Sequence, residues 1–206
     1  PDRVCELFIK LIKNARNHVE CVGYNFPQLS LKNLEISSSI RFINARFHGD
    51  VNICECEFSS KIIFEDCEFQ GTINIINNVF EKNADLLFSD CHFLSKLYMQ
   101  ENNFKGRVQF LACNFSTEAE INITRGNTFG RSLSFIGSTL QADLYLGEEG
   151  FRTVIRGYLD FTNITAYGDC HFVNLEIYKK AIFENAVFEG IVLFNNCLLY
   201  TSDAAD

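Results

Sequence analysis

The sequence predicts an all-β fold, a parallel β-helix of square cross-section preceded by one amphipathic helix. Three observations lead to this prediction. Apolar residues recur in units of eleven residues along most of the chain. Within each unit the apolar residues are spaced by two, as on one face of a strand, and glycine, asparagine and serine separate the units. Finally, equivalent positions match best in every second unit, which indicates that two units make one coil.

The first expected element is a helix within residues 1–28, which we assign to a helix and cap. Its apolar residues recur at helical spacing and are Val4, Phe8, Leu11, Ile12, Ala15 and Val19. A solenoid exposes its core and unpaired strand edges at its ends, so we expect this helix to cover the first coil. A membrane-surface helix and the end of an upstream domain are the alternatives.

The repeat domain is expected over residues 29–196. Each unit has apolar residues at its first, third and eighth positions and a small residue at its sixth. The clearest early units are Ile40, Phe42, Ala45, Phe47, then Val51, Ile53, Cys56, Phe58, then Ile62, Phe64, Cys67, Phe69. An eleven-residue period also fits a right-handed helical supercoil, because eleven residues fill three helical turns. The spacing of two and the turn residues exclude that alternative.

Alternate units supply different interior residues, so like residues are expected to stack along the axis. One predicted column contains Phe42, Phe64, Phe88 and Phe110, accompanied by the small residues Ala45, Cys67, Cys91 and Cys113. The other contains Ile53, Ile75, Met99 and Ile123, accompanied by Asn78 and Asn102. Each coil adds about 4.8 Å, and residues 29–196 provide about seven coils. Each buried Phe stabilises the fold by roughly 1.5 to 3 kcal/mol.

Residues 45–53, with the sequence ARFHGDVNI, resemble the A-x-F-x-G-x-V-x-F signature of pentapeptide-repeat proteins. The resemblance extends over about residues 29–196 and implies a right-handed quadrilateral β-helix. Cys, Asn and Ile replace many of the Ala and Leu residues typical of the family. The register breaks near residues 81–85, 116–120 and 152–157, and we assign no register to residues 166–180.

Nine cysteines raise the question of a metal site or disulfide bonds. The chain has no Cys-x-x-Cys pair, and the adjacent pairs Cys91–His92 and Cys170–His171 lie in predicted strands. Adjacent strand residues point to opposite faces and cannot hold one ion together. We therefore expect buried free thiols, no metal and no cofactor. Such dense use of free cysteine indicates a reducing compartment, so we expect a cytoplasmic protein.

The densest group of carboxylates comprises Glu55, Glu57, Glu65, Asp66 and Glu68. Close carboxylates can form an acid/base pair. Because consecutive units alternate around the coil, Glu57 and Glu68 are expected on opposite sides of the solenoid. No arrangement of the four histidines suggests a catalytic triad, and no glycine loop suggests phosphate binding. We therefore expect no enzyme activity.

Charge and length limit the classes of partner. The net charge of -8 disfavours direct binding of nucleic acid, which scales with basic residues. No run approaches the about 20 apolar residues that cross a bilayer. We expect a scaffold whose outer faces bind an unidentified protein partner, with dimerisation left open. The alternative, which the resemblance implies, is an acidic DNA mimic that binds a DNA-handling enzyme such as DNA gyrase through a surface that includes Glu55, Asp66 and Asp90.

Both ends of the chain carry expectations of their own. The sequence begins at Pro1, and its single methionine is Met99, so we expect the natural start to be missing. Residues 197–206 read CLLYTSDAAD, which resembles the translation of a transposase-type sequencing adapter. We therefore interpret these ten residues as an artefact and the chain as a fragment of a longer protein.

Overall fold

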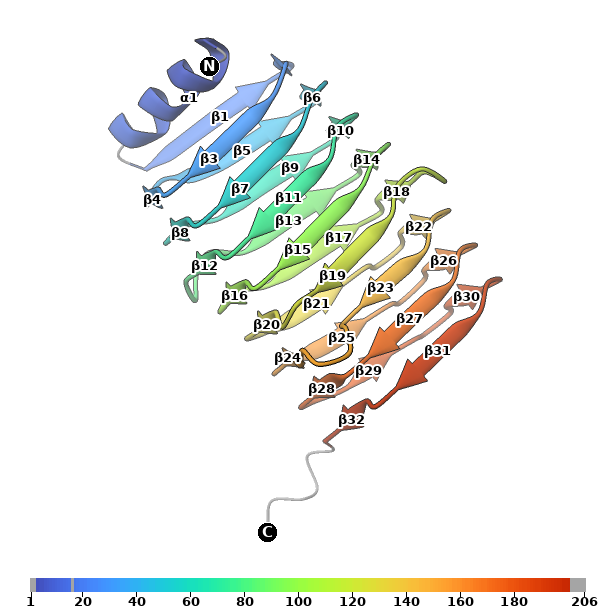
Figure 1. The fold of residues 1–206 in the computed structure, drawn as a ribbon. Coiled ribbons are helices and arrows are strands. Elements are labelled where there is room, and N and C mark those ends of the chain that lie inside the picture. The colour runs from blue at the N-terminus through green and yellow to red at the C-terminus, as the bar shows by residue number, and fades with distance from the viewer. Residues whose placement is uncertain (1–2, 16, 201–206) are drawn as a thin grey trace.

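The computed structural model describes residues 3–15 and 17–200 and shows one helix followed by a solenoid of four parallel β-sheets (Figure 1). The helix, α1, spans Arg3–Asn14. The chain passes through the four sheets in turn, one strand in each, and then enters the next coil. The predicted all-β solenoid with four faces and an N-terminal helix is thus confirmed. Residues 201–206 of the expected adapter tail lie outside the described residues.

Two opposite sheets, A and C, contain most of the longer strands. Sheet A consists of β1 (His18–Val22), β5 (Ser39–Ile43), β9 (Ile62–Glu65), β13 (Leu86–Ser89), β17 (Val108–Leu111), β21 (Ser132–Ser134), β25 (Tyr158–Asp160) and β29 (Ala181–Ile182). Sheet C consists of β3 (Leu29–Lys32), β7 (Val51–Cys54), β11 (Ile73–Ile76), β15 (Leu97–Gln100), β19 (Ile121–Thr124), β23 (Leu144–Leu146), β27 (Cys170–Val173) and β31 (Val192–Asn195). These two sheets are the broad faces of the solenoid.

The other two sheets, B and D, are built mostly from strands of two residues. Sheet B consists of β2 (Asn25–Phe26), β6 (Arg46–Phe47), β10 (Glu68–Phe69), β14 (His92–Phe93), β18 (Asn114–Phe115), β22 (Thr139–Leu140), β26 (Thr165–Ala166) and β30 (Val187–Phe188). Sheet D consists of β4 (Glu35–Ile36), β8 (Glu57–Phe58), β12 (Val79–Phe80), β16 (Asn103–Phe104), β20 (Thr128–Phe129), β24 (Thr153–Ile155), β28 (Leu175–Ile177) and β32 (Leu198–Leu199). They form the narrow faces.

The pairing register fixes the length of a coil. In sheet A, Ile40 pairs with Ile62 and Phe42 with Phe64, so equivalent residues are two units apart. Each sheet contains eight strands within the described residues, against the seven coils predicted. The additional coil arises because β1 and β2 already pair with β5 and β6, so that strands begin before residue 29. At the other end, β32 lies within the expected artefact segment and pairs with β28.

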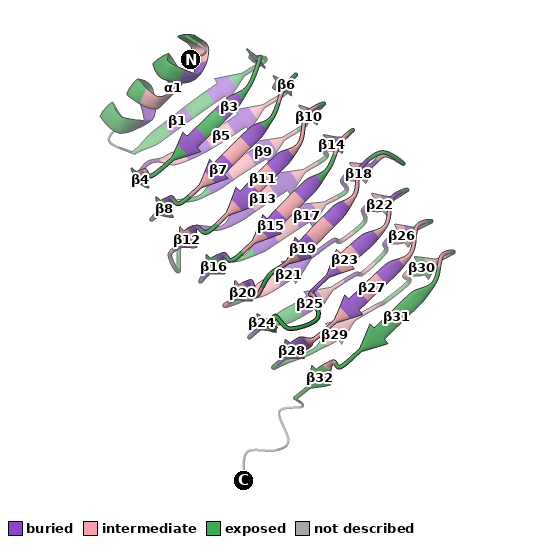
Figure 2. Ribbon diagram, in the orientation of Figure 1, coloured by how far each residue is buried: buried purple, intermediate pink, exposed green. Residues whose placement is uncertain are grey.

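Inward and outward residues alternate along the strands, as period-two patterning requires (Figure 2). In β7, for example, Val51 and Ile53 are buried, whereas Asn52 and Cys54 are half-buried. The interior contains rings in columns. Phe42, Phe64, Phe88 and Phe110 stack with successive centroids 4.9 Å apart and planes nearly parallel. The rings of sheet B form a second column that meets the first edge to face, a favourable geometry for aromatic pairs.

Both corners that follow the broad sheets use a left-handed backbone conformation. After each strand of sheet A comes one residue with positive φ: Gly23, Asn44, Asp66, Asp90, Ala112, Gly137, Asn163 and Asn185. After each strand of sheet C comes another: Asn33, Glu55, Asn77, Glu101, Arg125, Gly147, Asn174 and Asn196. Asparagine, aspartate and glycine tolerate this region best, which explains their frequency at these two corners.

The helix α1 covers one end of the solenoid, as Figure 1 shows. Its Phe8 ring lies 5.3 Å from the Phe42 ring, and the Ser38 hydroxyl donates a hydrogen bond to the Ile12 carbonyl. Val19, grouped with the helix by its spacing, instead lies in β1, because the helix ends at Asn14. At the other end, β31 stands at the edge of sheet C and its apolar Phe194 is 53% exposed (Figure 2).

Candidate interaction surface

The structure separates the three acidic residues that the sequence grouped as a surface. Asp66 and Asp90 lie on successive coils at the corner after sheet A, whereas Glu55 lies at the opposite corner, after sheet C. All three occupy the left-handed position of their coil. The tolerance of aspartate for this conformation accounts for the placement of Asp66 and Asp90, and sequence reasoning missed it because it considered only charge. The sequence does contain a signal for these corners, because the residue that follows a predicted strand is often Asn, Asp or Gly.

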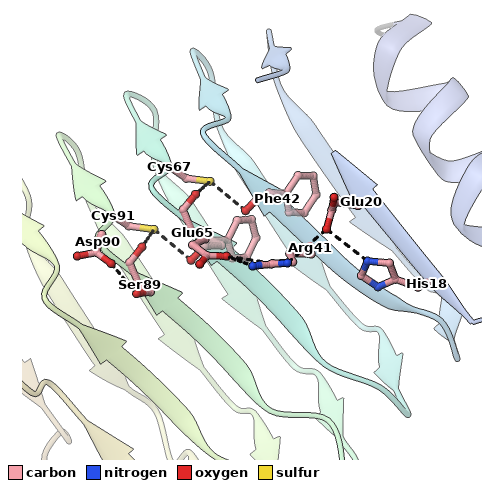
Figure 3. A network of polar contacts seen from close by, with 10 residues as sticks. His18, Glu20, Arg41, Phe42, Glu65, Cys67, Ser89, Asp90 and Cys91 are labelled. Carbon is pink, nitrogen blue, oxygen red and sulfur yellow. Dashed lines mark hydrogen bonds and ion pairs between the residues drawn. The ribbon is translucent and has the colours of Figure 1, made fainter. Parts of the chain in front are cut away.

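Several acidic side chains on the faces are paired with basic ones on neighbouring coils. On sheet A, Arg41 of β5 lies between Glu20 of β1 and Glu65 of β9, as Figure 3 shows. Its Nε donates to Glu65 at 3.0 Å and its Nη1 to Glu20 at 3.4 Å. Hydrogen bonding to Glu65 raises the pKa of Arg41. These three side chains thus link three successive coils and place a basic group between two acidic ones.

The same arrangement recurs on other parts of the surface. The further pairs between coils are Lys32–Glu55 at 3.9 Å, Lys96–Glu120 at 2.9 Å, Lys105–Glu81 at 2.6 Å, Arg107–Asp85 at 3.7 Å and Arg152–Glu176 at 3.2 Å. Hydrogen bonds from Asn122 and Lys96 lower the pKa of Glu120. Exposed pairs of this kind contribute little to stability individually. Where these pairs occur, acidic and basic groups alternate over short distances on the surface.

The carboxylates predicted to lie apart are apart. Glu57 belongs to β8 in sheet D and Glu68 to β10 in sheet B, on the two narrow sides of the solenoid. Glu65 and Asp66 are adjacent in sequence, but Glu65 pairs with Arg41 on the face while Asp66 occupies the corner. The structure therefore does not bring this carboxylate group together at one point.

The second set of predicted interior residues lies on the opposite broad sheet. Ile53, Ile75, Met99 and Ile123 pair in register on sheet C, and each is no more than 1% exposed. Beside them Asn78, Asn102 and Asn127 form a buried ladder at the corner. The Asn78 Nδ2 donates to the Asn102 Oδ1 at 3.0 Å and to the Ile53 carbonyl at 2.8 Å. These bonds satisfy polar groups that would be unfavourable inside a core.

Cys67, Cys91 and Cys113 form the corresponding column beside sheet A. Each thiol lies against the backbone of the preceding coil: Cys91 Sγ donates to the Phe64 carbonyl at 3.4 Å, and Cys113 Sγ to the Phe88 carbonyl at 3.4 Å. The neighbouring Cys91 thiol, together with burial, raises the pKa of Cys67, and burial raises that of Cys91. The Cys67 and Cys91 thiols therefore stay protonated near neutral pH and are poor nucleophiles.

A cationic hollow on sheet A was not found from the sequence. It gathers Arg107, Arg131, Arg156 and Lys179 from four successive coils. Residues 3–15 and 17–200 include no group of three or more His, Cys, Asp or Glu side chains placed to hold a metal ion. Within the same ranges, no helix has the length and apolar character needed to cross a bilayer.

We compared the chain with known proteins. Neither a scan against models of protein families nor a search of curated proteins gives a match for this chain.

Proposed function

We propose that this chain is a non-enzymatic scaffold of the pentapeptide-repeat type, whose outer faces bind a protein partner. The observation that carries the proposal is the pairing of charges between coils, exemplified by Glu20, Arg41 and Glu65. Such pairs link neighbouring coils and give the broad faces a mixed charge, which suits a polar protein interface. The four-faced coil and the Phe columns support the family assignment, because the resemblance of residues 45–53 implies this architecture.

A DNA mimic, the rival function, requires phosphate-like rows of unpaired acidic groups. Asp66 and Asp90 form a row of two, which Asn44 precedes and Ala112 follows at the same corner. Glu55 belongs to the opposite corner, where Asn33 and Asn77 flank it. These short rows favour the scaffold over the mimic, since mimicry depends on a continuous field of one sign.

The scaffold is tested by site-specific photo-crosslinking from all four faces of one coil. A benzophenone amino acid is placed at an outward position of each sheet: Leu87 in β13, His92 in β14, Tyr98 in β15 or Asn103 in β16. We expect one face, or two adjacent faces, to yield a discrete crosslinked protein in cells. Equal yields from all four faces, or none above a sample without illumination, would contradict a face-specific scaffold. The four sites lie in one coil, so each serves as a control for the others.

A further inference from the structure

A hollow of about 630 Å³ lies on the outer surface of sheet A, over β17, β21 and β25. Its floor includes Ser134, which points outward yet is only 3% exposed. Ser134 is recessed because the residues paired with it on the two neighbouring strands, Gln109 and Asp160, are larger. The volume falls within the range of roughly 300 to 1,000 Å³ that is typical of small-molecule sites.

Four cationic side chains line this hollow, namely Arg107, Arg131, Arg156 and Lys179, and Asp160 is the one carboxylate among its lining residues. The concentration of positive charge is notable on a chain with a net charge of -8. Asp160 is already engaged, because its Oδ1 accepts hydrogen bonds from the Thr162 amide at 3.0 Å and the Thr162 hydroxyl at 2.6 Å. The hollow is therefore cationic overall.

Most of these cations have no carboxylate partner in the described part of the chain. The Arg156 guanidinium lies 5.7 Å from the Tyr178 ring centroid, and the Lys179 ammonium lies 5.3 Å from the Tyr158 ring centroid. An aromatic face holds a cation in place without neutralising it. Arg131 has no ion pair within residues 3–15 and 17–200. Only Arg107 is paired, at 3.7 Å from Asp85.

Gly157 allows the backbones of two coils to approach each other closely beside the hollow. In sheet A, Ser132 pairs with Tyr158, which places Gly157 beside Arg131 of the preceding coil. A Cβ atom at Gly157 would lie 1.2 Å from the Arg131 carbonyl oxygen, so this position excludes a side chain. At position 157 itself the lining of the hollow is therefore backbone without a side chain.

We propose that this hollow binds a compact anion that carries two or more phosphate or carboxylate groups. Guanidinium groups match the geometry of both oxyanions and bind them through paired hydrogen bonds. Several unpaired cations on neighbouring coils favour a multivalent anion over a monovalent one, because their mutual repulsion is relieved together. A long nucleic acid fits less well, since Glu20 and Glu65 lie further along the same sheet. This binding function goes beyond the scaffold and does not depend on it.

Isothermal titration calorimetry with pyrophosphate and with citrate tests the proposal on the whole chain at about 50 mM salt, where screening is modest. We expect one ion to bind per chain. The Arg131→Gln/Arg156→Gln variant should weaken binding by about tenfold or more, because charge-assisted hydrogen bonds are lost. Arg46→Gln removes an exposed arginine from sheet B and should bind as the parent does. Lys179→Gln provides a second variant, and circular dichroism verifies that each variant is folded.

The two ions distinguish the chemistry of the ligand. Tighter binding of pyrophosphate assigns a phosphate ligand, and tighter binding of citrate assigns a carboxylate ligand. A Kd weaker than about 10 mM for both ions would overturn the proposal. An equal loss of affinity in Arg46→Gln would also overturn the proposal, because it would show that the anion binds exposed arginines in general.

Discussion

Phe64 lies at the middle of a column of parallel rings, 4.9 Å from Phe42 on one side and 4.9 Å from Phe88 on the other. It also meets the edges of two rings from sheet B. Because only 1% of its surface is exposed, removing the Phe64 ring would leave a space in the interior that the surrounding residues fill only in part. Its contribution is therefore one of packing and apolar burial.

Phe64→Ala should lower the free energy of unfolding by roughly 3 to 5 kcal/mol, since it removes buried area and leaves a cavity between stacked rings. Chemical denaturation of parent and variant measures the difference. Phe151→Ala is the matched control, because the Phe151 side chain is 48% exposed, and it should change stability by less than about 0.5 kcal/mol. A loss below about 1 kcal/mol at Phe64 would show that the ring is not in a packed column.

At the scale of the element, each strand of a broad sheet is followed by a residue in the left-handed region. Ala112 occupies this position after β17, with φ of 50°, although its Cβ makes the conformation unfavourable. Its backbone amide donates a hydrogen bond to the Ile136 carbonyl at 2.9 Å, so the next coil holds this corner in place. The packed stack thus holds Ala112 in a conformation that its own preference opposes.

Ala112→Gly should raise the free energy of unfolding by about 0.5 to 1 kcal/mol, because glycine adopts positive φ without steric strain. Ala45→Gly is the control, because Ala45 is buried and has no positive φ. This substitution should lower the free energy of unfolding by about 1 kcal/mol. Thermal unfolding of both variants measures the pair. Destabilisation by Ala112→Gly as large as that by Ala45→Gly would contradict a strained corner.

The strands and their stacking could be predicted from the sequence because the interior residues repeat with little variation. Phe42 and Phe64 are two units apart, and their pairing follows from the period alone. The cationic hollow could not be predicted, because Arg131, Arg156 and Lys179 belong to coils where the register is irregular. Arg156 falls within the predicted register break at residues 152–157, and Lys179 within residues 166–180, for which the sequence assigned none. In the structure, β24 pairs with β28 across these segments.

At the scale of the whole molecule, the arrangement of charge follows from the coil. Residues one coil apart lie side by side, so a basic residue separated from an acidic one by two units neutralises it, as Lys96 and Glu120 do. The basic residues distributed among the acidic ones in the sequence thereby become partners on the surface. Among the described residues, acidic groups without an ion pair remain between these pairs, among them Asp66 and Asp90 at one corner and the in-register neighbours Glu35 and Glu57 on sheet D. We propose that this surface, with its paired charges, makes the chain a scaffold and not a DNA mimic.

A DNA supercoiling assay with DNA gyrase at physiological salt tests this claim most directly. We predict no inhibition by the chain at concentrations up to about 10 μM, since interspersed basic groups break any phosphate-like pattern and salt screens the remainder. The triple variant Glu55→Lys/Asp66→Lys/Asp90→Lys should behave as the parent does. Potent inhibition by the parent that weakens steeply with salt and is abolished in the triple variant would contradict the scaffold and establish mimicry.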